Sequence, residues 1–108
     1  AVSSGNSFVH ETESQVILNG SYNINFTMDL VLKDAGLFDN LAKKLNSSLE
    51  ISPKIVEIFK DGEKKYGSRA WSSMIVKRME DLNKVDFRAS GFPDELTDNE
   101  PEEKGYEI

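Results

Sequence analysis

The chain has 108 residues, a formal net charge of −6, a single histidine (His10) and no cysteine. This length allows one domain with a small core, and the composition excludes disulfides, thiolate catalysis and the usual zinc sites. No run approaches the roughly 20 apolar residues that span a bilayer, and no charged and apolar leader opens the chain. We therefore expect a soluble, cytoplasmic protein that does not insert into a membrane.

The charge is unevenly distributed. Residues 86–108 hold eight acidic residues against Arg88 and Lys104, so this segment carries the whole net charge and residues 1–85 are balanced. A neutral body with an acidic tail gives no reason to expect a nucleic acid as partner. We divide the chain into a helical body, residues 1–85, and an acidic C-terminal tail, residues 86–108. Anchor-like apolar residues predict that the tail is held by its own body or by a neighbouring subunit: Phe87, Phe92, Pro93, Leu96, Tyr106 and Ile108.

In chain order, the first expected element is a short helix from Ser3 to about Ser14, followed by the polar connector GSYNIN. Between them, Gln15 to Leu18 shows a β-like alternation that is too short and isolated to define a sheet. The next element is a long helix from about Asn25 to Leu45. It would be roughly 30 Å long at 1.5 Å per residue.

The long helix carries a broad apolar stripe, in which Asp34 falls inside the stripe and Lys33 at its edge. A carboxylate on a core-facing stripe is costly unless a cation or hydrogen-bond donors meet it. This Lys-Asp pair is therefore the main candidate for a functional role. The stripe consists of Phe26, Leu30, Val31, Leu37, Phe38, Leu41, Ala42 and Leu45.

Two more helices are expected in the second half of the chain. Ser52, as a capping hydroxyl, and Pro53, at the first helical position, start one of them, and Gly67 ends it. Gly62 lies on its apolar face, which indicates close approach of another helix. The last helix runs from about Ala70 to Leu82, and its regularly spaced apolar residues are expected to be core: Trp71, Met74, Ile75, Met79 and Leu82.

These elements predict an all-α fold. The stripe of the long helix covers about half its circumference, and only two other substantial helices are available to cover it. We therefore expect another domain or another subunit to complete the burial.

The order SSGNSF, FTMDLVLKDAGL, a proline-started helix and GSRAWSSMIVKRMED resembles the C-terminal helical domain of the β-hydroxyacid dehydrogenases. These enzymes are relatives of 3-hydroxyisobutyrate dehydrogenase and 2-hydroxy-3-oxopropionate reductase, within the group similar to 6-phosphogluconate dehydrogenase. The resemblance runs from about Ser3 to Leu82. Its sharpest part is a phenylalanine seven residues before the Lys-Asp pair, which is similar to the KDLGLA signature of the family.

The resemblance implies that Lys33, Asp34 and Phe26 face the nicotinamide cofactor, NAD or NADP. Phe8 stands where the family often has tryptophan, so it is a candidate substrate contact. The family's catalytic lysine is expected upstream of Ala1, which leaves no catalytic residue in this chain, and no metal site is expected. Because no GxGxxG motif follows a strand, we expect the dinucleotide-binding domain to lie outside the chain as well.

The expected role is thus the cleft-forming and oligomerisation domain of an enzyme that transfers hydride between NAD(P) and a small hydroxy acid or semialdehyde. Its partners would be its own dinucleotide-binding domain, the hydroxy acid substrate and a second subunit. By itself the chain should not turn over substrate. Two alternatives remain open: a free-standing helical oligomerisation or interaction module without catalysis, and a helix-turn-helix reader within residues 52–81, which the net charge and scarce basic groups disfavour.

Overall fold

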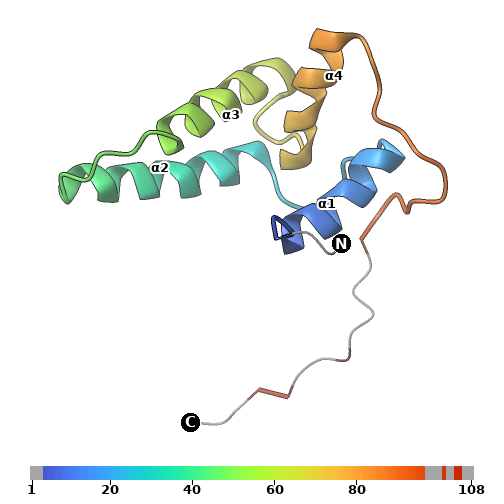
Figure 1. Cartoon of the computed structure of the whole chain (residues 1–108), viewed down its shortest axis with the longest axis horizontal. Helices are drawn as coiled ribbons and strands as arrows, with labels where there is room; N and C mark the ends of the chain where they lie inside the picture. The colour runs from blue at the N-terminus through green and yellow to red at the C-terminus, as the bar shows by residue number, and fades with distance from the viewer. Residues whose placement is uncertain (1–3, 97–100, 102–103, 106–108) are drawn as a thin grey trace.

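The computed structural model describes residues 4–96, 101 and 104–105, which form an all-α domain (Figure 1). The expected fold class is confirmed. Within this part of the chain no β-strand forms, and Thr27 and Trp71 make an isolated antiparallel bridge. Ser3, Tyr106 and Ile108, which the sequence interpretation used, lie outside the described residues. The elements are α1 (Phe8–Asn19), α2 (Met28–Lys44), α3 (Ser52–Tyr66), the 3₁₀ helix η1 (Ser72–Val76) and α4 (Lys77–Asn83).

Helices α2 and α3 pack side by side as an antiparallel hairpin, with η1 and α4 against one end of it (Figure 1). Gly62 of α3 is buried at that end. A Cβ atom placed on Gly62 would lie 2.7 Å from Cδ1 of Ile75 and 3.4 Å from Cε of Met28, whose side chain is fully buried. The predicted close approach at Gly62 is therefore confirmed. The close contact at Gly62 brings α2, α3 and η1 together in one small core.

The first turn of α2 is held by backbone hydrogen bonds from elsewhere in the chain. The amides of Met28 and Asp29 donate to the carbonyls of Ala70 and Ser68 at 2.9 and 3.0 Å. These bonds satisfy helix-terminal donors that have no partner within the helix. Thr27 has extended dihedral angles in its bridge to Trp71, so the helix begins at Met28 and not near Asn25 as expected.

The first helix lies later in the chain than predicted. Ser7 caps its start by accepting a 3.1 Å hydrogen bond from the amide of His10, and Gly20 ends it in a left-handed conformation with φ 91°. The segment Gln15–Leu18, whose β-like alternation is too short and isolated to define a sheet, lies in the C-terminal part of α1, and no strand forms there. An alternation over four residues is compatible with the period of a strand and with that of a helix. The glycine at position 20 is a helix stop signal, which favours the helix.

The starts and ends of the later helices were predicted in part. The stop at Gly67 is confirmed, with φ 103°, and Pro53 stands in the first turn of α3 as expected. The predicted capping by Ser52 is wrong, because its hydroxyl donates to Asp39 of α2 at 2.5 Å.

The expected single helix over residues 70–82 is divided into η1 and α4. Its start is fixed by the bridge at Trp71, and the amide of Ser72 donates to the carbonyl of Phe26 at 2.8 Å.

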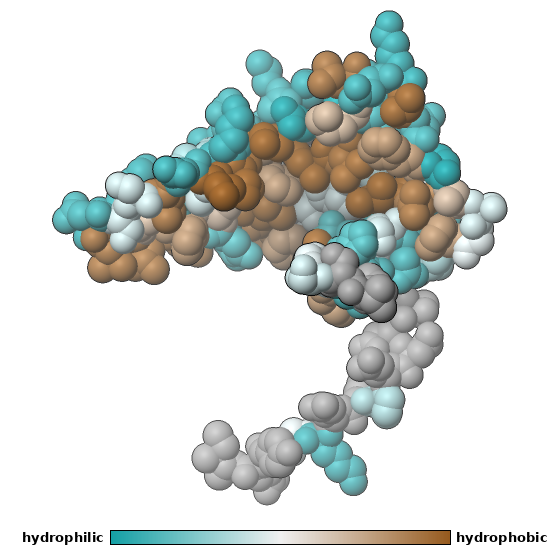
Figure 2. Space-filling view, in the orientation of Figure 1, coloured by the Kyte–Doolittle hydropathy of each residue, from teal (hydrophilic) through white to brown (hydrophobic). Residues whose placement is uncertain are grey.

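Several residues expected in the core are exposed. Met79 and Leu82 of α4 keep 49% and 74% of their surface, which contradicts their assignment to the core. Much of the apolar stripe of α2 also stays uncovered by the described part of the chain, although its member Ala42 is buried. Figure 2 shows hydrophobic surface along this part of the hairpin. The stripe residues that remain more than half exposed are Leu37, Phe38, Leu41 and Leu45.

The packing at Gly62 predicts the effect of adding a side chain there. Gly62→Leu should lower the free energy of unfolding by about 1–3 kcal/mol, because the leucine has to displace Ile75 and Met28. The matched control is Gly36→Leu in α2, where a Cβ meets nothing within 4 Å. This control should gain about 0.5–1 kcal/mol from helix propensity. Denaturant unfolding measures both, and equal stabilities of the two variants would contradict the packing described.

Candidate functional site

The predicted Lys-Asp pair stands on the open side of α2. The Lys33 ammonium lies 3.2 Å from the Asp34 carboxylate, and the two side chains are 61% and 59% exposed. The burial cost expected for Asp34 does not arise in this chain, because the stripe that contains it faces solvent. An exposed pair of this kind contributes little to stability. Both charges are therefore available to a further binding partner.

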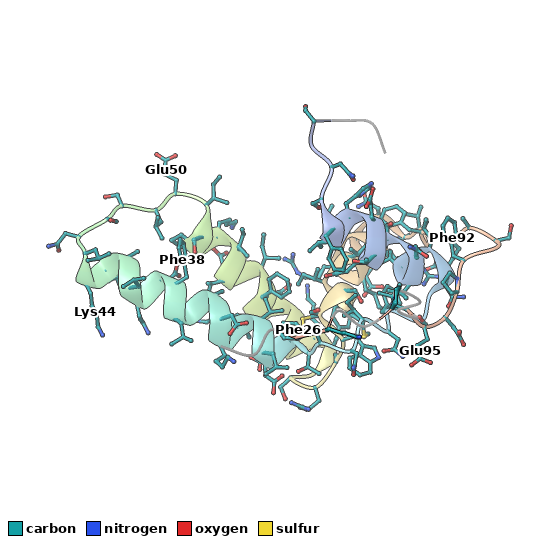
Figure 3. All side chains as sticks on the ribbon, turned by 90° about the horizontal axis from the view of Figure 1, so that it is seen from below. Phe26, Phe38, Lys44, Glu50, Phe92 and Glu95 are labelled. Carbon is teal, nitrogen blue, oxygen red and sulfur yellow. The ribbon has the colours of Figure 1, made fainter. Side chains whose placement is uncertain are left out.

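The two predicted aromatic contacts lie on different elements. Phe26 lies two residues before the start of α2, is 37% exposed, and stands where the hairpin joins the rest of the domain (Figure 3). Phe8 is the first residue of α1 and is 79% exposed. In the described part of the chain, no hydrogen bond or ion pair joins either residue to Lys33. The structure thus brings Lys33 and Asp34 into contact, with Phe26 shortly before them in the chain and Phe8 on a separate helix.

Both carboxylate oxygens of Asp29, at the start of α2, accept hydrogen bonds. Asp29 accepts hydrogen bonds from the Thr27 hydroxyl and from Arg69, whose Nη1 lies 2.9 Å away. The hydrogen bonds from Thr27 and then Arg69 lower the pKa of the Asp29 carboxyl. Lys33 follows one turn later, and its ion pair in the described part of the chain is with Asp34. Asp29 therefore does not neutralise Lys33.

Three hollows border the described part of the hairpin, and Lys33 lines none of them. A groove of about 400 Å³ between α2 and α3 has charged walls that include Asp39, Lys43 and Lys60. A wider apolar hollow of about 770 Å³ lies at the closed end of the hairpin, with Phe38 and Ile51 among its walls. Lys33 therefore belongs to an open wall and not to a closed pocket. Among the described residues, no cluster of acidic and histidine side chains could hold a metal ion, and no helix is long and apolar enough to cross a bilayer.

A buried polar cluster, which the sequence interpretation did not identify, lies on the other side of the domain. Glu80 of α4 is fully buried and accepts hydrogen bonds from the Tyr22 hydroxyl at 2.6 Å and from Nη1 of Arg88 at 3.0 Å. Nη2 of Arg88 also donates to the Tyr22 hydroxyl at 2.8 Å. These three side chains form a closed triangle, which we call the Glu80 cluster. Each buried polar atom in it has a partner, as low-dielectric surroundings demand.

The Glu80 cluster changes the proton affinities of its members. Burial acts to raise the pKa of Glu80, but the hydrogen bonds from Tyr22 and Arg88, together with the charge of Arg88, outweigh it and lower the pKa below its ordinary value. Burial and the hydrogen bond to Glu80 raise the pKa of the Tyr22 hydroxyl. Glu80 is therefore a buried carboxylate that stays ionised at neutral pH.

The comparisons with known proteins give one match. A family model described as "NAD-binding of NADP-dependent 3-hydroxyisobutyrate dehydrogenase" matches residues 1–79. The matched range includes Phe8, Phe26, Lys33 and Asp34, and it ends one residue before Glu80. No curated protein and no solved structure matches the chain.

The Glu80 cluster predicts a specific dependence of stability on pH. Because the folded state lowers the pKa of Glu80, its stabilisation is complete above the ordinary value of 4.5 and is lost as the pH falls through the lowered value. Glu80→Gln should therefore be less stable than the wild type by about 1.5–3 kcal/mol at pH 7, the worth of hydrogen bonds to a charged group. This difference should disappear at acidic pH.

Denaturant unfolding at pH values from 7 down to 3 measures this dependence. The control is Glu57→Gln, which removes an exposed carboxylate 3.1 Å from Lys54 and should change stability by less than about 0.5 kcal/mol. A Glu80→Gln variant with wild-type stability at pH 7 would show that the cluster does not depend on the carboxylate charge.

Proposed function

The chain belongs to the NADP-dependent 3-hydroxyisobutyrate dehydrogenase family, and on this premise we propose that it forms one wall of the cleft in which cofactor and substrate meet. The intact enzyme is an oxidoreductase whose cofactor is NAD or NADP. The single observation that carries the proposal is Lys33, an exposed ammonium within the matched residues on a helix face that this chain leaves open.

The position of the chain within the enzyme is part of the proposal. We assign it to the C-terminal helical domain, with the dinucleotide-binding fold and the catalytic lysine supplied by another part of the enzyme. The all-helical structure of the described residues supports this, because a nicotinamide dinucleotide is bound by a glycine-rich turn between a strand and a helix. The chain's own contribution is then one face of the cleft.

The residues on this face fit such a role. The Lys33 ammonium can donate a charge-assisted hydrogen bond to an oxygen of the cofactor or substrate, and Asp34, 3.2 Å away, orients it. Phe26 offers an aromatic surface at the start of the same helix, and Phe8 offers one on α1 for the substrate end. When bound, NAD(P) accepts or donates the hydride at the hydroxyl-bearing carbon of a small hydroxy acid or the matching semialdehyde. The chain's residues position and desolvate the reactants.

The exposed apolar face of α2 supports an oligomer. Leu37, Phe38 and Leu41 of α2, and Leu45 at its C-cap, are all more than half exposed. Contiguous apolar surface of this kind commonly marks an interface. We propose that a second subunit covers this face in the intact enzyme. A free-standing interaction module without catalysis would share this face, but it would have no use for Lys33.

Lys33 provides the main test of the proposed function. In the intact enzyme, Lys33→Ala should lower kcat/KM by one to two decades, because it removes a charge-assisted contact worth about 1.5–3 kcal/mol. The free energy of unfolding should change by less than about 0.5 kcal/mol, since the pair with Asp34 is exposed. Lys33→Arg should restore activity only in part, because a planar guanidinium does not replace a compact ammonium.

Lys44 is the matched control for this experiment. It lies on nearly the same side of α2 but three turns further on, roughly 16 Å along the axis, near the closed end of the hairpin (Figure 3). Lys44→Ala should keep wild-type kinetics. If Lys33→Ala and Lys44→Ala were both silent, Lys33 would be an ordinary surface lysine, and the non-catalytic module would be the better description.

The oligomer proposal has its own test. Leu41→Lys places a charge in the centre of the exposed apolar face and should shift the protein from a dimer or larger assembly toward the monomer. The fold should be retained, because Leu41 is 54% exposed and the two residues have similar helix propensity. Sedimentation equilibrium measures the mass, with Leu82→Lys on α4 as the control. A monomeric wild type at high concentration would contradict the proposal.

A further inference from the structure

The segment after α4 turns back over the end of α1 (Figure 1). The amide of Ala89 donates to the carbonyl of Leu18 at 3.0 Å. The Asn19 side-chain amide donates to the carbonyl of Phe92 at 3.0 Å, and the Ser21 hydroxyl donates to that of Asp94 at 2.6 Å. These bonds join stretches of chain more than 70 residues apart. We call residues 85–94 the strap; they all lie beyond the range that the family model matches.

Arg88 is the anchor of the strap. Besides its bonds to Glu80 and Tyr22, its Nη1 donates to the carbonyl of Ile17 at 3.3 Å. Its guanidinium also lies 5.2 Å from the centre of the Tyr22 ring, within the range of a cation–π contact. Gly20 leaves the space that the side chain needs, because a Cβ atom there would lie 2.5 Å from Nε of Arg88. The end of α1 and the strap are therefore fitted to each other.

The other connections of α1 are few. Its packing against the rest of the domain is chiefly with η1. There the Ser73 hydroxyl donates to the carbonyl of Tyr22 at 2.5 Å. The strap also supplies donors to Ile17 and Leu18, whose carbonyls lie in the last turn of a helix where intrahelical partners run out. By contrast, α2 is held by α3 and by the segment at residues 68–72. Loss of the strap should therefore loosen α1 while the hairpin keeps its structure.

We propose that residues 85–94 are a strap that holds α1 and the α1–α2 connector in place, with Arg88 as the positioning residue. Because α1 carries Phe8 and α2 carries Lys33, the strap sets the place of the substrate-side aromatic contact independently of the cofactor-side lysine. The proposal that the strap orders α1 depends only on the hydrogen bonds and packing contacts described above. Its effect on substrate binding rests on the proposed function.

Amide hydrogen exchange tests the ordering of α1. In Arg88→Ala, amides of α1 and of the connector should exchange about 10- to 100-fold faster, and the acceleration in α2 and α3 should be much smaller. The matched control is Arg69→Ala, which removes an arginine–carboxylate pair of similar length, 2.9 Å, at an exposed site. It should leave α1 unchanged. Unchanged exchange of α1 in Arg88→Ala, or an equal acceleration throughout the domain, would overturn the proposal that the strap holds α1 in place.

Arg88→Lys covers the case in which the alanine variant does not fold. Lysine keeps the charge and can reach Glu80, but it cannot serve Glu80, Tyr22 and Ile17 together. The exchange of α1 in this variant should lie between wild type and Arg88→Ala, and a wild-type pattern would contradict the anchoring role.

Kinetics of the intact enzyme test the positioning. Arg88→Ala should raise KM for the hydroxy acid several-fold, with little change in kcat or in KM for the cofactor, because only α1 is loosened. A general loss of folded enzyme would lower the apparent kcat and leave both KM values unchanged, and that result would overturn the positioning role. If Lys33→Ala were silent while α1 exchanged faster in Arg88→Ala, the proposed function would fail and the strap would stand.

Discussion

The buried carboxylate of Glu80 is the constraint on which the arrangement of this domain depends. An ionised carboxylate away from water is tolerated only when its oxygens are satisfied, and here a tyrosine and an arginine from distant parts of the chain satisfy them. Tyr22 comes from the connector between α1 and α2, and Arg88 comes from the segment after α4. Satisfying one side chain therefore fixes the path of the chain at both ends of the helical body.

The hairpin of α2 and α3 divides a structural role and the proposed binding role between the two sides of one helix. On the inner side, Met28 and Ala42 are buried, and Gly62 lets the helices approach. On the outer side, Lys33, Asp34 and a row of large apolar residues stay exposed. A charged pair that contributes little to stability can be kept for binding at no structural cost. The same helix can thus carry the core of this domain and a surface for the rest of the enzyme.

The acidic character of the chain has two parts with different physical roles. Within the body, several acidic side chains form ion pairs: Asp29 with Arg69, Asp61 with Arg78 and Lys65, and Asp81 with Lys77. From residue 86 on, acidic residues outnumber basic ones. The first part of this segment is held by hydrogen bonds of its backbone at Ala89, Phe92 and Asp94, and by the side chain of Arg88. Its own body therefore holds the tail as far as Asp94. The predicted anchors Tyr106 and Ile108 lie outside the described residues.

Local signals in the sequence determined the fold class, the presence of the two hairpin helices, the stop at Gly67 and the close approach at Gly62, because periodicity and glycine or proline chemistry act over a few residues. The sequence also placed Lys33 beside Asp34 and supported the family. Tertiary structure alone decided the rest. Neighbours far along the chain decide which side of α2 is covered and why Met79 and Leu82 are exposed. They also decide why the last helix divides at Val76. Glu80 shows the reason most clearly, since its partner Tyr22 lies 58 residues away and no local pattern marks a buried glutamate that pairs with so distant a tyrosine.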